Sequence, residues 1–357
     1  MLMIIFGAGA SYDSDPVHPI PSAAGTSGGR LPLARDLFWS GYGKFAASYP
    51  ACQGLMTRLR AAAPNVEPEL ERIRAEAKKR TYLLRQLEGV RYYLRALIHE
   101  SEDNWFRVLV DHVTTYTNLL EEVEGWREES DERLALVTFN YDCLLDHACR
   151  SVIPGLRLAR VADFAGRENH SVFKLHGSID WNQGVSFSET RVLMDPALDT
   201  ENRMIDDVMI THPTGQYWRD GEQAPKGVPG YGYARPAIAI PMVTKGGNDF
   251  ACPADHVSTL RQIIPSVTNL IVVGWRGEEE HFHDLWREAE RQGGVIPLRR
   301  MLVVDASEEA AQGVLDRLKA ALKVPEGVAA EGYGGGFAAA LQQGVFSRFL
   351  GAYRKPA

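Results

Sequence analysis

The sequence is poor in cysteine and has no excess of positive charge. Its 357 residues include only four cysteines, none of which forms a C-x-x-C pair or stands near a suitably spaced histidine. A zinc ribbon and a disulfide framework are therefore not expected, and reduced thiols fit best. Acidic residues outnumber basic ones by 46 to 39, which gives a formal charge of −7. This balance argues against direct nucleic-acid binding, which needs a basic face.

Long apolar runs are also missing. No stretch approaches the roughly 18 apolar residues that a membrane span requires. The apolar run Leu2–Phe6 is too short for the core of a secretory signal, and the first basic residue, Arg30, comes only after it. We therefore expect a cytoplasmic protein with no membrane partner.

Short apolar runs are what the sequence does contain, and they are typical of strands buried on both faces. The runs are Leu2–Phe6, Leu134–Phe139, Val172–Leu175, Ala237–Val243, Leu270–Val273 and Met301–Val304. Helical stretches alternate with the later runs, at Val257–Ile264, His281–Gln292 and Glu308–Leu322. This alternation predicts an α/β fold with a Rossmann-like, doubly wound parallel sheet.

The chain is expected to form a single domain over residues 1–357 with two additions. A helical insertion is expected at about residues 44–131, where apolar residues recur at spacings of three and four. These residues are Leu87, Val90, Leu94 and Leu97, followed by Trp105, Leu109, Val113 and Tyr116. An irregular excursion is expected at about residues 184–232, which are rich in proline and glycine.

Candidate binding residues follow the apolar runs, because ligands of such sheets bind outside the carboxyl ends of the strands. The first run is followed by Gly7-Ala8-Gly9-Ala10-Ser11. Small residues there let the backbone approach a pyrophosphate, and backbone N–H groups at a turn or helix start can bind it. A tight turn without any ligand explains the same residues about as well.

Polar side chains follow two further runs. Thr138, Asn140 and Asp142 stand at the end of one run, although short polar side chains in this position also cap helices, and a helix is expected next. His176 follows another run and is itself followed by a glycine, where a ligand can come close. A single histidine is, however, more often structural than catalytic.

One other cluster contains potential metal ligands, His281 and His283. On a helix, residues two apart point to different sides, so the two rings are poorly placed to share an ion. We expect no metal site.

The three motifs, taken in order, resemble those of the sirtuin-like family, and most closely its bacterial branch found in anti-phage defence. They are G-A-G-A-S from Gly7, T-x-N-x-D from Thr138, and K-L-H-G-S from Lys174. The resemblance implies that the first loop holds the phosphates of NAD. It also implies that Asn140 orients a water at the nicotinamide ribose and that His176 is the general base.

Further residues acquire a cofactor-binding role from the same resemblance. Asp142 is implied to be the acid beside the nicotinamide pocket, and the motifs also include Thr138, Gly177 and Ser178. Two later pairs stand where the family contacts the adenosine ribose and adenine, namely Gly274-Trp275 and Asp305-Ala306. Ordinary loop glycines and helix capping explain these later residues equally well.

The sequence departs from the family in ways that bear on the reaction. Protein-deacylating sirtuins usually carry a four-cysteine zinc module and a phenylalanine–glycine–glutamate segment that docks an acyl-lysine peptide. The chain lacks the zinc module, and its comparable stretch, Ala239–Lys245, lacks that segment. Water is therefore the expected acceptor, which makes the protein a NAD hydrolase that releases nicotinamide and ADP-ribose. A protein deacylase or ADP-ribosyltransferase, and a non-catalytic NAD or ADP-ribose sensor, remain alternatives.

The residue chemistry agrees with this reaction. Cleavage of a bond to ribose passes through an oxocarbenium-like state, and nicotinamide is already a cationic leaving group. An asparagine orients a water without adding charge, and a histidine accepts a proton near neutral pH.

The resemblance also implies partners and regulation. Similar bacterial proteins deplete cellular NAD during phage infection, and such an activity must be held in check. We expect a homo-oligomer, and a separately encoded activator such as a HerA-type ATPase or an Argonaute-like protein.

Overall fold

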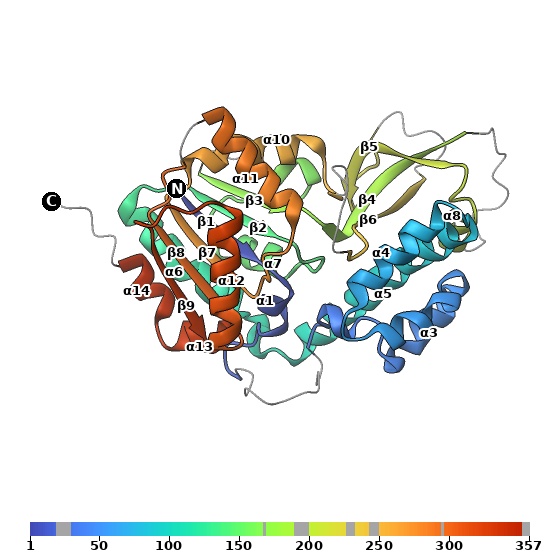
Figure 1. The fold of residues 1–357 in the computed structure, drawn as a ribbon, viewed down its shortest axis with the longest axis horizontal. Coiled ribbons are helices and arrows are strands. Elements are labelled where there is room, and N and C mark those ends of the chain that lie inside the picture. Colours follow the sequence, from blue (N-terminus) through green and yellow to red (C-terminus); the bar gives the residue numbers. More distant parts are fainter. Residues whose placement is uncertain are drawn as a thin grey trace. The chain divides into compact units, whose positions relative to one another are not determined.

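The computed structural model describes residues 1–18, 30–166, 169–188, 200–225, 233–242, 250–293 and 296–351. The chain divides into two compact units (Figure 1). The first comprises Met1–Leu31, Glu102–Leu175 and Ala254–Ala357, and the second comprises Pro32–Ser101 and His176–Pro253. None of the helices in the described part of the chain combines the length and apolar character that crossing a bilayer requires.

The first unit is built on a six-stranded parallel sheet of order β3-β2-β1-β7-β8-β9. Its strands are β1 (Leu2–Phe6), β2 (Leu134–Thr138), β3 (His170–Lys174), β7 (Asn269–Val273), β8 (Arg300–Asp305) and β9 (Ala329–Gly334). Every residue of β1, β2 and β7 is buried, as expected for strands covered on both faces. The predicted α/β fold with a doubly wound parallel sheet is confirmed.

Helices cover both faces of this sheet. They are α1 (Ala8–Tyr12), α6 (Thr115–Ser130), α7 (Leu144–Val152), α10 (Ala254–Ile263), α11 (Glu280–Gly293), α12 (Glu308–Ala321), α13 (Phe337–Gln342) and α14 (Val345–Gly351). Crossovers through α6 and α7 lead away from β1 in one direction, and those through α11 and α12 lead in the other. Because such crossovers are right-handed, the two pairs lie on opposite faces.

The strand order reverses beside β1. From β1 the chain continues to β2 and β3 on one side, whereas β7, β8 and β9 lie on the other. Sheets of this order bind dinucleotides outside the carboxyl ends of the strands, at the point of reversal. In this chain that point lies between β1 and β7, which are followed by Gly7 and Gly274.

Glycines allow the ends of β1 and β7 to lie in direct contact. The N–H of Gly7 donates to the Val273 carbonyl at 3.0 Å, and that of Gly9 donates to the Gly274 carbonyl at 3.0 Å. A Cβ added to Gly7 would lie 2.5 Å from the Gly274 oxygen, and one added to Gly274 would lie 2.4 Å from the Ala10 nitrogen. Gly274 also has a φ of +58°, which costs other residues about 1–2 kcal/mol. The packing of the strand ends therefore requires these glycines.

The second unit combines a three-stranded antiparallel sheet with helices. Its strands are β4 (Gly177–Phe187), β5 (Thr211–Arg219) and β6 (Ala234–Ile238), in the order β5-β4-β6. Its helices are α2 (Gly43–Ser48), α3 (Gln53–Ala62), α4 (Val66–Ala77), α8 (Thr200–Asp206) and most of α5 (Tyr82–Val108). The end of α5, from Glu102 onward, belongs to the first unit. The helical pattern predicted within α5 is confirmed by four buried side chains, those of Leu87, Val90, Leu94 and Leu97.

The pattern expected to continue as far as Tyr116 is interrupted. Helix α5 ends at Val108 and α6 begins at Thr115, and Asp111 between them has a φ of 56°. Trp105 and Tyr116 are nevertheless buried. Their spacing therefore reflects tertiary packing around a break in the helix.

Two other stretches also differ from expectation. The run Ala237–Val243 was expected to join the parallel sheet, but its described part contributes to β6, which pairs antiparallel with β4; Val243 lies outside the described residues. Residues 184–232 contain α8 and β5 where irregular structure is expected, and 189–199 and 226–232 lie outside the described residues. A short apolar run predicts a buried strand, but it does not identify the partner of that strand.

Alanine at the strand-end contact will destabilise the protein. Gly274→Ala places a Cβ against the Ala10 nitrogen at a positive φ, and we expect it to lower the free energy of unfolding by about 2 kcal/mol or more. Gly313→Ala is the matched control, because Gly313 lies in α12 with nothing within 4 Å of an added Cβ, and it should raise stability by about 0.5–1 kcal/mol. Denaturant titration measures both; equal midpoints for the two variants would contradict the contact.

Candidate active site

Asn140 lies two residues after β2, at the carboxyl edge of the first unit's sheet, and its side-chain amide is held by three contacts. Its Nδ2 donates to the Gly7 carbonyl at 2.9 Å and lies 2.9 Å from Ser11 Oγ and 3.2 Å from the Tyr116 hydroxyl. A carbonyl only accepts hydrogen bonds, so the contact with Gly7 fixes which end of the amide faces it. Oδ1 of Asn140 accepts no hydrogen bond from the described residues, and the residue is 7% exposed. The fold thus holds the amide nitrogen and leaves the amide oxygen available.

Tyr116 supports this arrangement from α6. Its hydroxyl lies 2.9 Å from Ser11 Oγ, and its ring packs on Phe6 and Phe337 with centroid separations of 4.9 and 5.4 Å. Burial raises the pKa of Tyr116 well above its ordinary value, so the phenol stays neutral and keeps its proton for hydrogen bonding. The sequence gives no sign of this role, because Tyr116 fits the apolar pattern of a helix.

Asp142 makes a helix-capping hydrogen bond, which is the explanation of this motif that needs no ligand. Its Oδ1 accepts the N–H of Leu144, the first residue of α7, at 3.2 Å. Burial raises the pKa of Asp142, and the nearby Lys174 ammonium opposes that shift. Thr138 contributes its hydroxyl, which accepts the backbone N–H of Asn140 at 3.0 Å. Both side chains therefore shape the turn that presents Asn140.

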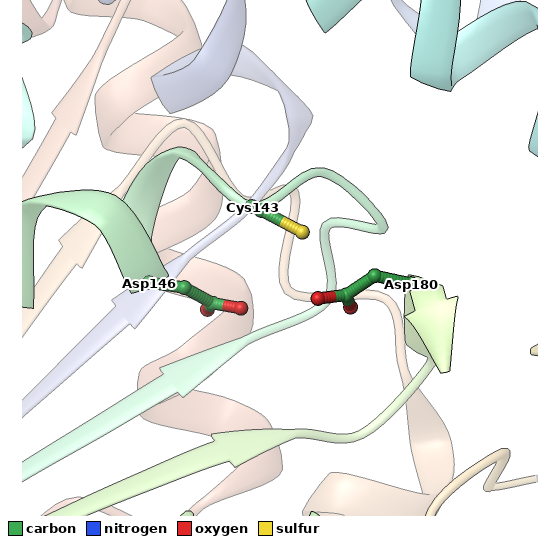
Figure 2. Close-up of side chains that lie close together, drawn as sticks. All are labelled: Cys143, Asp146 and Asp180. Carbon is green, nitrogen blue, oxygen red and sulfur yellow. The ribbon is translucent and has the colours of Figure 1, made fainter. Parts of the chain in front are cut away.

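A buried ion pair lies next to this turn. Lys174 and Asp146 both have fully buried side chains, and Lys174 Nζ donates to the two Asp146 oxygens at 3.3 and 3.2 Å. The same ammonium donates to the Asp142 carbonyl at 2.7 Å. Figure 2 shows Asp146 in the first turn of α7 and Cys143 just before it. Strand β3 is thereby tied to the turn that follows β2.

The residues after β7 and β8 make structural contacts within the first unit. Trp275 is 3% exposed; its indole stacks on Phe139 at 4.8 Å and 13° and donates a hydrogen bond to Glu279. Asp305 ends β8, and its Oδ1 accepts the N–H of Ala306 at 2.7 Å. Burial raises the pKa of Asp305. Their roles in binding adenosine stay predictions.

His176, Gly177 and Ser178 belong to the second unit. A Cβ on Gly177 would lie 1.7 Å from the Ala237 carbonyl, and its φ is +78°, so the pairing of β4 with β6 requires glycine there. Ser178 Oγ donates to Asp180 Oδ1 at 2.6 Å. Asp180 lies on the same strand, β4 (Figure 2). The hydroxyl proton of Ser178 is therefore committed within the fold.

The chain connects His176 directly to the first unit. His176 follows Leu175, whose N–H donates to the Thr138 carbonyl at 3.1 Å. Thr138 stands two positions before Asn140. The general base expected from the sequence is thus joined covalently to the strand end beside the Asn140 turn, although the two side chains belong to different units.

Comparisons with known proteins find likenesses among solved structures. No protein-family model and no curated protein matches the chain. The chain is similar to a Sir2 structure in complex with an inhibitor, 2′-O-acetyl-ADP-ribose and a deacetylated p53 peptide, with 14% identity, a TM-score of 0.36, and coverage of 98% of this chain and 94% of that one. It is also similar to a structure concerned with sirtuin substrate affinity, with 15% identity, a TM-score of 0.30, and coverage of 85% and 82%. The α/β fold class is established by the sheet itself.

Removal of the Lys174 ammonium will strongly destabilise the first unit. Lys174→Met leaves the buried Asp146 carboxylate without its cation, and we expect a loss of about 3–5 kcal/mol. The double variant Lys174→Met/Asp146→Leu removes both charges and should recover most of that loss. Chemical unfolding of both variants tests the pair; equal stabilities would show that charge compensation is not what Lys174 provides.

Proposed function

We propose that this protein hydrolyses NAD at the bond between nicotinamide and ribose, giving nicotinamide and ADP-ribose. The observation that carries the proposal is the fixed amide of Asn140. Its nitrogen is held by the Gly7 carbonyl, and its oxygen is left to accept a hydrogen bond at the carboxyl edge of a parallel sheet. A water bound to that oxygen is oriented by a group that adds no charge.

The sheet supports NAD as the substrate. Its strand order is the one found in dinucleotide-binding folds, with the reversal between β1 and β7. Gly7, Gly9 and Gly274 follow those strands without side chains that would block the approach of a pyrophosphate. We place the phosphates near Gly7–Ser11 and the adenosine toward Asp305 and Ala306, as the motif resemblance implies.

The proposed chemistry divides the work between two residues. When the bond breaks, its electron pair goes to the cationic nicotinamide ring, which leaves as neutral nicotinamide, and the ribose becomes oxocarbenium-like, so the site has to position one nucleophile. Asn140 orients the water, and His176 takes a proton from the water or from a ribose hydroxyl. A proton transfer of this kind contributes about a hundred- to ten-thousand-fold in rate.

Water rather than a protein side chain is the proposed acceptor. The chain lacks the zinc module and the peptide-docking segment of protein-deacylating sirtuins, which its motifs otherwise resemble. The same resemblance supports NAD depletion in the cytoplasm during anti-phage defence, controlled by self-assembly or by a partner such as a HerA-type ATPase or an Argonaute-like protein. An unregulated monomer with full activity would contradict that control.

Nicotinamide release from NAD by the purified full-length protein tests the reaction. We expect release without any peptide, and a loss of about a hundred-fold or more in both Asn140→Ala and His176→Ala. Asn104→Ala and His212→Ala are matched controls, because both residues are exposed, and they should leave the rate unchanged.

The other outcomes separate the alternatives. Release that requires an acylated peptide would identify a deacylase or transferase, and tight NAD binding without cleavage would identify a sensor. Failure to bind NAD at all would overturn the proposal.

A further inference from the structure

Glu102 is a buried carboxyl that contacts the Asn140 turn from outside the predicted motifs. It lies near the end of α5, in the part of that helix that belongs to the first unit. Its side chain is buried, whereas its neighbours Asp103 and Asn104 are exposed. One Glu102 oxygen, Oε2, accepts the backbone N–H of Cys143. Cys143 ends the turn that begins at Asn140, so this contact anchors the far end of that turn.

The charges around this turn do not balance if every group is ionised. Three buried carboxyls, those of Glu102, Asp142 and Asp146, share the neighbourhood of one buried ammonium, that of Lys174. The ammonium donates to both oxygens of Asp146 and to the backbone of Asp142. Buried charge without a partner is strongly disfavoured. At least one carboxyl of the set must therefore hold a proton.

Glu102 is the carboxyl best placed to hold that proton. Among the described residues no cation lies within ion-pair distance of it, and its one hydrogen bond comes from the neutral backbone N–H of Cys143. The Asp142 carboxyl instead receives two hydrogen bonds, from the Ser11 hydroxyl and from the Leu144 N–H. Burial and then the charge of Asp142 raise the pKa of Glu102 to about 8; the Cys143 N–H and Lys174 oppose this shift, and Asp146 adds to it. A protonated carboxyl still accepts through its carbonyl oxygen, so the contact with Cys143 survives protonation.

We propose that Glu102 is a positioning residue that works as a neutral carboxylic acid, anchoring Cys143 and so fixing the turn that presents Asn140 and Asp142. The catalytic part of this inference rests on the proposed NAD cleavage, but the protonation of Glu102 does not. Ionised Glu102 would place a second negative charge beside Asp142 and weaken the turn. Activity should therefore fall as the pH rises through the range in which Glu102 loses its proton.

Stability measured against pH tests the protonation directly. The pKa of Glu102 is 4.5 when the chain is unfolded and about 8 when it is folded. Between these two pH values the carboxyl is protonated in the folded protein and ionised in the unfolded one, so unfolding becomes easier as the pH rises. Glu102→Gln keeps a neutral group that accepts from Cys143 and cannot titrate. The unfolding constant of the wild type relative to Glu102→Gln should rise by up to about tenfold per pH unit across this window and level off above it.

A matched control and a direct probe accompany this titration. Glu128→Gln changes an exposed glutamate on α6 and should show no such pH dependence relative to the wild type. Infrared spectroscopy should detect a protonated carboxyl in the wild type near neutral pH that is absent from Glu102→Gln. If the ratio of the unfolding constants of the wild type and Glu102→Gln did not change between pH 4.5 and pH 8, the proposal would be overturned, whether or not the protein cleaves NAD.

The activity measurement tests the positioning role. Glu102→Gln should retain the wild-type kcat near pH 7 and extend activity to higher pH, whereas Glu102→Ala should lower kcat by up to about a hundred-fold through misplacement of Asn140. KM should change much less than kcat. If kcat fell at the same alkaline pH in the wild type and in Glu102→Gln, the positioning role would be contradicted. Absence of NAD cleavage in the wild type would instead count against the proposed function and leave the stability test intact.

Discussion

The close contact between the ends of β1 and β7 is the constraint on which the rest of the site depends. Gly7 and Gly9 lie against Gly274 at distances that exclude a Cβ. The contact fixes the Gly7 backbone, and the Gly7 carbonyl in turn accepts the hydrogen bond that orients Asn140. Gly7 therefore connects three neighbouring strands: it follows β1, packs against the end of β7, and holds the Asn140 side chain that follows β2.

The polar groups around this contact can be buried because each forms a hydrogen bond with another group of the site. Ser11 and Tyr116 hold the Asn140 side-chain amide, while Lys174 and Glu102 hold the backbone of the turn. Burial of such groups is costly unless they are paired, and a paired network rigidifies the structure. The outcome is a rigid turn in which the Asn140 side-chain oxygen accepts no hydrogen bond from the described residues, and such an oxygen can orient a nucleophilic water.

The structure separates residues that look equivalent in the sequence. Trp275, Asp305 and Ser178 each make contacts within their own unit that explain their presence without a ligand. Asn140 differs because its structural contacts use only the nitrogen of its amide. The proposal for NAD cleavage therefore relies on Asn140 and on His176, and less on the later strand ends.

The sequence alone determined the α/β class, the strands β1, β2, β7 and β8, and the position of the candidate residues at strand ends, because apolar runs and glycines act locally. It did not determine the partner of β6 or the break between α5 and α6, since pairing and helix ends depend on contacts distant in the chain. From the local sequence pattern, Glu102 is predicted to lie on a solvent-exposed helix face and Tyr116 to lie in the core. Only the tertiary structure decided that both reach the Asn140 turn, because the two residues meet it through packing that no local pattern records.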